Sequence, residues 1–185
     1  MIDRKKMAEI IRVNHAGEFG AKVIYDGQIA ALKMKNDHET IELVKHMKEQ
    51  ENLHFDYFDD KIKQKKIRPT IMQPLWKIGG FALGFLTAAL NKKAAMCCTI
   101  AVEEVIDEHY QNQIKYIKKE EKFLNQDEKK EFAELQEKIE KFRKEELEHR
   151  DIGYEHKAED LSYFKPLSTL IKCATKTAIF ISKKI

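Results

Sequence analysis

The stretch Glu145-Glu146-Leu147-Glu148-His149 lies late in a charged segment whose pattern predicts a helix from about 128 to 157. Along this segment one stripe recurs at alternating steps of three and four residues, which is the face that a helix turns toward its neighbours. The stripe consists of Phe132, Leu135, Ile139, Phe142, Glu146, His149, Gly153 and His156. Its first half is apolar, and then a carboxylate and an imidazole take core positions. Because a buried, unpaired carboxylate is costly, we expect Glu146 to have a partner, a hydrogen-bond network or a metal.

The composition limits the class of protein. The chain has 185 residues, 43% hydrophobic and 35% charged, which is enough for one domain with a real core. With only 7 Gly and 3 Pro, long helices are expected. Acidic and basic residues nearly cancel, at 31 against 34, and no basic block dominates, so the composition argues against nucleic-acid binding.

Cysteines and the start of the chain bear on the compartment. The three cysteines, Cys97, Cys98 and Cys173, have no disulfide-framework or zinc spacing, which favours a reducing environment. Helical patterning begins within the first few residues, with Asp3 as a candidate N-cap, so neither a signal peptide nor a transit peptide is expected.

Hydrophobic periodicity predicts an all-α fold in a single domain over 1–185, with six helices. Four long helices are expected at about 5–34, 39–63, 91–121 and 128–157. Each has an apolar seam with polar residues in the middle. These residues are Glu18 on the first helix, Glu51 and His54 on the second, Glu103 on the third, and Glu146 and His149 on the fourth. Glu145 and Glu148 fall off the seam, and we expect them to be replaceable surface carboxylates.

Small residues surround Glu18 on the first helix. They are Ala16, Gly17, Gly20 and Ala21. Because glycine weakens a helix, two of them close together indicate either the tight approach of another backbone or room for a ligand.

Two further segments are apolar or amphipathic. The segment 75–90 is shorter than the roughly 20 residues that span a bilayer, so we interpret it as a helix that is buried or lies in a membrane interface. The segment 167–185 predicts a basic amphipathic helix. Its pattern fits contact with a membrane surface and docking onto the 75–90 helix equally well.

The seam residues give the pattern Glu, Glu-x-x-His, Glu, Glu-x-x-His on four successive long helices. This is the ligand set of ferritin-like di-iron bundles, in which carboxylates neutralise and bridge two irons and each iron takes one His. Chance alone would give about 0.8 Glu-x-x-His pairs in this composition, so the signal lies in the conjunction of seam, order and helix. Glu103 follows Glu18 by 85 residues and Glu146 follows Glu51 by 95, as in a weak internal repeat.

Motifs along nearly the whole chain resemble one family, the demethoxyubiquinone hydroxylases. The motifs are Arg12-Val-Asn-His-Ala-Gly-Glu-Phe-Gly-Ala21, Arg68-Pro-Thr, Pro74-Leu-Trp, Gly80-Phe-Ala-Leu-Gly84, Ala101-Val-Glu-Glu104, His109-Tyr-Gln-Asn-Gln-Ile114, Phe142-Arg-Lys-Glu-Glu-Leu-Glu-His149 and Asp151-Ile-Gly153. The resemblance implies the same six iron ligands, and it implies that His109 and Tyr110 lie near a substrate quinone. Asn14 departs from the family, in which many relatives have Asp.

The implied reaction is hydroxylation of the ring of a polyprenylated demethoxy-benzoquinone with O2 and NADH-derived electrons. No nucleotide-binding motif is present, so the resemblance leaves delivery of electrons to the quinone itself or to a partner. It also implies a homo-oligomer, a lipid-binding partner protein of ubiquinone biosynthesis, and a peripheral position on the cytoplasmic face of a bacterial inner membrane or the matrix face of the mitochondrial one. The two apolar helices would then seat the bundle on the membrane surface.

Two other functions remain open at this point. One is a generic ferritin-like ferroxidase or peroxide scavenger, which has no need for two extra apolar helices. The other is a non-enzymatic helical scaffold at a membrane surface, in which Glu and His residues merely pair with one another.

Overall fold

Helices make up the whole of the described fold, as the periodicity predicts. The computed structural model describes residues 4–123 and 125–184, so the candidate N-cap Asp3 lies outside the described residues. Across these two ranges no residue forms a strand. The elements are α1 (Arg4–Met34), α2 (His38–Lys65), α3 (Gln73–Leu90), α4 (Lys92–Glu120), the 3-10 turn η1 (Glu121–Phe123), α5 (Gln126–Glu155), the 3-10 turn η2 (Ala158–Asp160) and α6 (Phe164–Lys184).

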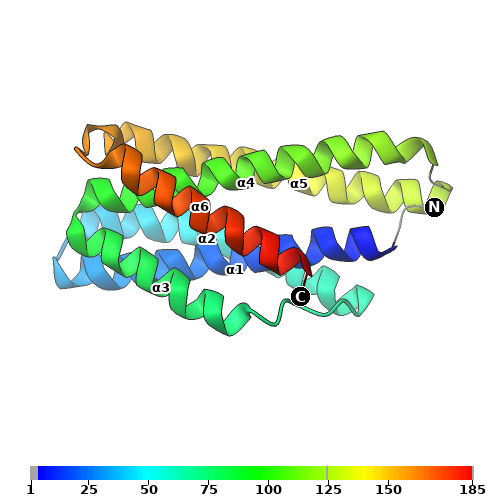
Figure 1. The fold of residues 1–185 in the computed structure, drawn as a ribbon, viewed down its shortest axis with the longest axis horizontal. Coiled ribbons are helices and arrows are strands. Elements are labelled where there is room, and N and C mark those ends of the chain that lie inside the picture. Colours follow the sequence, from blue (N-terminus) through cyan, green and yellow to red (C-terminus); the bar gives the residue numbers. More distant parts are fainter. Residues whose placement is uncertain (1–3, 124, 185) are drawn as a thin grey trace.

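Four long helices form the bundle. α1 pairs with α2 and α4 pairs with α5, and the two pairs lie one above the other in Figure 1. α3 packs along α1, while α6 crosses α4 and α1 on the same side of the bundle. The apolar core forms two main clusters, one around Phe58 and Ile139 and the other around Met47 and Ile100. The polar seam residues lie between these clusters along each helix.

Polar caps and prolines set the helix ends. Asp37 accepts from the backbone of Thr40 at the start of α2, and Asn91 accepts from Ala94 at the start of α4. α6 begins at Phe164, not at 167 as expected, because Pro166 lies in its first turn. A proline there has no hydrogen bond to lose, so it begins the helix and does not precede it.

α1 and α3 approach closely at two glycines. A Cβ on Gly84 would lie 1.9 Å from the backbone oxygen of Ile24, and one on Gly27 would lie 2.2 Å from that of Phe81. In contrast, a Cβ on Gly20 would meet nothing within 4 Å. The tight helix contact is therefore made by Gly27 and Gly84, and the space beside Gly20 is open.

α6 is attached to the bundle by polar contacts with two helices. Lys172 and Lys176 pair with Glu104 and Glu108 of α4, the second pair at 2.7 Å. Trp76 Nε1 of α3 donates to Ser182 Oγ of α6 at 3.0 Å. The sequence offered docking onto the 75–90 helix as one interpretation, but α6 packs mainly on α4 and α1 and not on α3. The other interpretation, contact with a membrane surface, stays a prediction. No described helix combines the length and the apolar character needed to cross a bilayer.

Candidate metal centre

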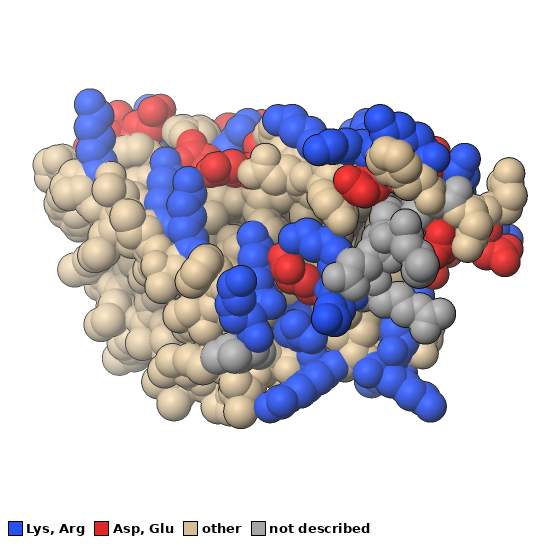
Figure 2. All heavy atoms as spheres, turned by 45° about the vertical axis from the view of Figure 1, so that its right-hand side comes forward, with Lys and Arg blue, Asp and Glu red and all other residues tan. Residues whose placement is uncertain are grey.

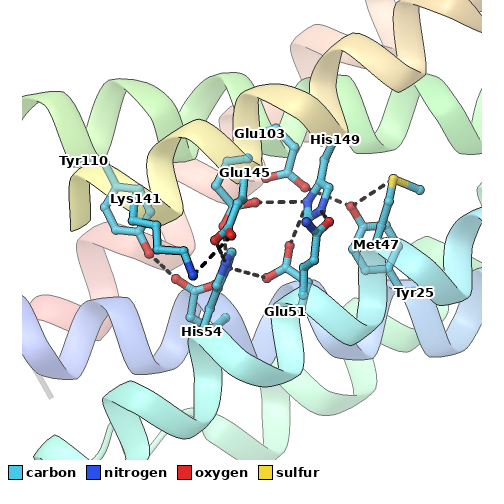
Figure 3. A network of polar contacts seen from close by, with 12 residues as sticks. Tyr25, Met47, Glu51, His54, Glu103, Tyr110, Lys141, Glu145 and His149 are labelled. Carbon is cyan, nitrogen blue, oxygen red and sulfur yellow. Dashed lines mark hydrogen bonds and ion pairs between the residues drawn. The ribbon is translucent and has the colours of Figure 1, made fainter. Parts of the chain in front are cut away.

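The structure brings together all six residues that the seams single out. Glu18, Glu51, His54, Glu103, Glu146 and His149 meet in the middle of the bundle, each with at most 3% of its surface exposed. α1 and α4 contribute one glutamate each, and α2 and α5 contribute a Glu-x-x-His pair each. Figure 3 shows Glu51 and His54 of α2, Glu103 of α4 and His149 of α5 pointing toward one another.

The six side chains form two overlapping groups of four. Glu18, Glu51, His54 and Glu146 have ligand atoms within 4.8 Å of one another, and so do Glu51, Glu103, Glu146 and His149. Glu51 and Glu146 belong to both groups, which places them between two adjacent positions. Glu18 and His54 belong to one position, which we call position A, and Glu103 and His149 belong to the other, position B.

Both histidines present Nδ1 to the shared glutamates. His54 Nδ1 lies 3.1 Å from Glu146 Oε1 and 3.8 Å from Glu51 Oε2. His149 Nδ1 lies 3.2 Å from an oxygen of each of these two glutamates. The two imidazoles therefore have the same orientation toward the centre.

The other ring nitrogen of each histidine has an acceptor outside the cluster. His54 Nε2 lies 2.8 Å from Glu145 Oε2, and His149 Nε2 lies 2.7 Å from Gln50 Oε1. The expectation that Glu145 is a replaceable surface carboxylate is therefore wrong. Glu145 is off its own seam but faces α2, and a helical seam says nothing about contacts made from its flank. Glu148 is exposed, as expected.

Two buried tyrosines complete the surroundings. Tyr25 on α1 donates to Glu103 Oε1 at 3.1 Å, and Tyr110 on α4 donates to Glu18 Oε1. Burial raises the pKa of both phenols, and the neighbouring carboxylates raise it further. Both hydroxyls therefore remain protonated donors at neutral pH. Tyr25 and Tyr110 each lie seven residues after the single glutamate of their own helix.

Burial and mutual repulsion control the charges of the cluster. Burial raises the pKa of Glu51 and of Glu103 well above the usual range, and Glu146 raises both further. Burial alone would lower the pKa of His54, but its contacts with Glu146 and Glu18 raise it to about 12. The pKa of Glu146 is lowered, because the two histidines outweigh the effect of burial. The pKa of His149 is also raised, because its contacts with Glu146 outweigh the effect of burial.

The donor set fits a pair of divalent metal ions. Among the described side chains, both oxygens of Glu51, one oxygen each of Glu103 and Glu146, and His149 Nδ1 are buried and form no well-directed hydrogen bond, although His149 Nδ1 lies 3.2 Å from Glu51 and from Glu146. Buried polar atoms are rarely left unpaired, so these atoms indicate a ligand. Carboxylate oxygens and imidazole suit iron and similar ions, and four carboxylates neutralise two dications. The arrangement can therefore hold two metals that share Glu51 and Glu146.

The residues that the resemblance places near a quinone are separated. Tyr110 points into the cluster, whereas His109 contacts Gln113 at 2.7 Å and lies beside Lys6 and Lys183. Gln113 also exchanges two hydrogen bonds with Asn14, at 2.9 and 2.7 Å. An aspartate at position 14 could not donate the first of these bonds, which accounts for the amide at this place.

An apolar cavity of about 400 Å³ lies beside the cluster. α1, α3, α4 and α6 line it, and among the described residues its polar lining consists of Trp76, Thr175 and Ser182. Gly17 and Val102, which directly precede Glu18 and Glu103, are part of its wall. The cavity therefore reaches the two helices that carry the single glutamates.

A four-helix bundle with one Glu on each of two helices and Glu-x-x-His on each of the other two defines the class of carboxylate-bridged dimetal proteins. Within this class the chain belongs to one family. A family model described as "Ubiquinone biosynthesis protein COQ7" matches residues 5–182, so the chain is a member of that family. The family expected from the sequence motifs is thereby confirmed.

Curated relatives of this chain are named as demethoxyubiquinone or demethoxyubiquinol hydroxylases. A mitochondrial NADPH-dependent 3-demethoxyubiquinone 3-hydroxylase of Dictyostelium discoideum is 44% identical over 100% of this chain and 80% of its own length. The human protein of the same name is 41% identical with the same coverage. A 3-demethoxyubiquinol 3-hydroxylase of Rhodospirillum rubrum is 42% identical over 100% of this chain and 79% of its own length.

Proposed function

We propose that this chain is a di-iron monooxygenase that hydroxylates the ring of a polyprenylated demethoxyubiquinone in ubiquinone biosynthesis. Family membership and the names of the relatives support the reaction and the substrate class. The observation that carries the proposal is the conjunction of a buried Glu and His cluster with an apolar cavity beside it. A generic ferroxidase would need the first of these but not the second.

Six residues of this chain would hold the metals. Glu18 and His54 would help to hold one iron and Glu103 and His149 the other, while Glu51 and Glu146 belong to both groups of ligands. When bound, the iron pair supplies the activation of O2 that the hydroxylation needs. The protein excludes water from the site, since each ligand is at least 97% buried, and it orients the single glutamates through the hydroxyls of Tyr25 and Tyr110.

The apolar cavity suits the substrate. Its volume of about 400 Å³ lies in the range of small-molecule pockets, roughly 300–1,000 Å³. Gly20 has no side chain to fill the space on the α1 side of the cavity, and apolar residues of α6 such as Ile171 and Ile179 form the opposite side. In this proposal the quinone ring approaches Glu18 and Glu103 while the prenyl chain lies between α3 and α6.

A reduced nicotinamide nucleotide would be the source of electrons. NADH is the donor that the sequence motifs imply, whereas the mitochondrial relatives are named NADPH-dependent. The donor is therefore a reduced nicotinamide nucleotide, and NADPH is the first one to test. Delivery through the quinone requires no nucleotide-binding loop in this chain.

Exposed apolar residues support a position on a membrane surface. On α3, Leu75, Ile78 and Leu86 are 51%, 70% and 62% exposed, and on α6 Leu170 and Phe180 are exposed as well. Figure 2 shows a broad surface without charged side chains bordered by Lys and Arg side chains. Such a surface fits an interface of apolar lipid and anionic headgroups. The substrate would then reach the cavity from the lipid.

A quinone assay in cells that lack the hydroxylation step tests the proposal. The wild-type chain should convert the accumulated demethoxyubiquinone into the hydroxylated product, and so should Glu148→Ala, because Glu148 is exposed. Glu146→Ala should abolish conversion, because Glu146 belongs to both groups of ligands. Conversion by Glu146→Ala would sink the assignment, and iron oxidation without quinone conversion by the wild type would identify a ferroxidase.

A further inference from the structure

The acceptors of the two outer histidine nitrogens occupy equivalent places in the two halves of the chain. His149 follows His54 by 95 residues, and Glu146 follows Glu51 by the same number. Glu145 follows Gln50 by 95 residues as well, and each of the two directly precedes a shared glutamate. Each accepts from the histidine of the opposite helix, at 2.8 and 2.7 Å. The duplicated bundle therefore repeats this contact, with a charged acceptor in one half and a neutral one in the other.

The tyrosine contacts of the two positions correspond, and both histidines face the shared glutamates. Each single glutamate accepts a hydrogen bond from a tyrosine of the opposite helix. Tyr110 donates to Glu18, and Tyr25 donates to Glu103. Each tyrosine lies seven residues after the glutamate of its own helix. Each histidine faces both shared glutamates through Nδ1.

The Nδ1 contacts differ in detail, since His54 Nδ1 hydrogen-bonds to Glu146 and lies 3.6 Å from Glu18, whereas His149 Nδ1 has no hydrogen-bond partner among the described residues. The exchange of Gln for Glu is the difference that changes the charge beside a histidine.

We propose that this difference makes the two metal positions inequivalent, with position A, held by Glu18 and His54, binding its ion more tightly than position B. The inference rests on the dimetal centre proposed above. Glu145 is a positioning residue in this account. It touches neither metal nor substrate and acts through the ring of His54.

The physical reason is the strength and charge of the outer hydrogen bond. A hydrogen bond from an imidazole N–H to a carboxylate is roughly twice as strong as one to a neutral acceptor. It fixes the tautomer that leaves Nδ1 free to bind metal, and it increases the basicity of that nitrogen. Gln50 fixes the tautomer of His149 in the same way but adds no charge.

The surroundings of Glu145 leave this effect intact. Its side chain is 21% exposed, and its other oxygen, Oε1, lies 3.5 Å from the Nζ of Lys141. Lys141 is 60% exposed, so solvent weakens this pair. Oε2 of Glu145 accepts from His54 Nε2, and Figure 3 marks this contact with a dashed line.

Titration of the metal-stripped full chain with Co²⁺, followed by visible absorption and calorimetry, tests the inference. The wild type should bind two ions in two steps of different affinity. Glu145→Gln should weaken the tighter step by about 10–100-fold, the usual effect of removing such an outer partner. Gln50→Glu should tighten the weaker step, and Glu148→Gln should change neither.

Variants that lack a ligand of one metal position show which position each Co²⁺ binding step belongs to. In Glu103→Ala, which retains the ligands of position A, adding Glu145→Gln should weaken the single Co²⁺ step. In Glu18→Ala, adding Glu145→Gln should have no effect, whereas adding Gln50→Glu should tighten it. The double exchange Gln50→Glu with Glu145→Gln should restore one tight step. If Glu145 only supported the fold, a carboxylate introduced at position 50 on α2 would not restore the tight step.

The outcomes separate the inference from the function on which it rests. If the wild type binds two Co²⁺ ions and Glu145→Gln leaves both constants unchanged, the inequivalence is wrong and the dimetal centre stands. Failure of the double exchange to restore a tight step would also overturn it. If the wild type binds no Co²⁺, the proposed dimetal centre itself is contradicted.

Discussion

Tyr25 on α1 and Tyr110 on α4 donate hydrogen bonds to the glutamates of each other's helices. Tyr25 lies seven residues after Glu18 but bonds to Glu103, and Tyr110 lies seven residues after Glu103 but bonds to Glu18. Helices α1 and α4 are thereby joined by two equivalent bonds at the centre of the bundle. Because burial raises the pKa of both phenols, they donate throughout the neutral range.

Removing either hydroxyl should destabilise the metal-free protein. Tyr25→Phe leaves a buried carboxylate oxygen without its donor, and the free energy of unfolding in urea should fall by about 1–3 kcal/mol. Tyr163→Phe is the matched control, because Tyr163 is exposed and its hydroxyl accepts from Asn91 Nδ2 at the surface, at 3.3 Å. A loss in Tyr25→Phe no larger than that in Tyr163→Phe would contradict the role of this bond.

The sequence predicts the six helices and the cluster well, and the reason is physical. Seam residues must face the core, so Glu18, Glu51 and Glu103 could be placed from periodicity alone. Helix ends were predicted to within three residues, and the start of α6 was missed because Pro166 belongs to its first turn.

Contacts between helices were not predictable in the same way. The bond from His54 to Glu145 depends on how α2 and α5 are rotated against each other, which periodicity does not give. A signal was nevertheless present, since Gln50 and Glu145 share the offset of 95 residues that relates Glu51 to Glu146. The closeness of Gly27 and Gly84 likewise depends on the crossing of α1 and α3.

Stability of the metal-free protein should fall as pH rises above about 6.5. The pKa of His54 is about 12 in the folded protein, against an ordinary value of 6.5. The folded state therefore keeps a proton that the unfolded state loses, and the stabilisation is complete below pH 6.5 and is lost toward pH 12. The raised pKa values of Glu51 and Glu103 act in the same direction, from their ordinary value of 4.5 upward.

Urea unfolding between pH 6.5 and 9.5 measures this dependence. For one proton the slope is at most about 1.4 kcal/mol per pH unit. His54→Gln should flatten it, and His46→Gln should leave it unchanged, because His46 is exposed. A stability that rises with pH over this range would show that the charge of the cluster has been misjudged.

Gly84, which lies in the close contact of α1 and α3, and Gly20, which lies outside it, should respond oppositely to substitution by alanine. Gly84→Ala forces a methyl group against the backbone of Ile24, and the free energy of unfolding should fall by about 3 kcal/mol or more. Gly20→Ala meets nothing within 4 Å and should stabilise α1 by about 0.5–1 kcal/mol. Equal effects at the two positions, measured by urea unfolding, would rule out the close helix contact.

Apolar residues of α3 should control binding to membranes. Replacing Leu75, Ile78 and Leu86 together by Ser should weaken co-sedimentation with vesicles of phosphatidylcholine and phosphatidylglycerol by tenfold or more, since each buried leucine or isoleucine contributes about 1.5–3 kcal/mol. Leu53→Ser is the matched control, because Leu53 is 66% exposed but lies on α2. Unchanged binding by the α3 variant would place the membrane contact elsewhere.

The iron content of the purified chain, measured by elemental analysis, tests the central claim most directly. Because the two groups of ligands share Glu51 and Glu146, the wild type should hold two irons per chain and Glu146→Ala should hold none. Glu148→Ala, which changes an exposed carboxylate two residues away, should retain both irons. A wild type without iron, or a Glu146→Ala variant that keeps two irons per chain, would contradict the account.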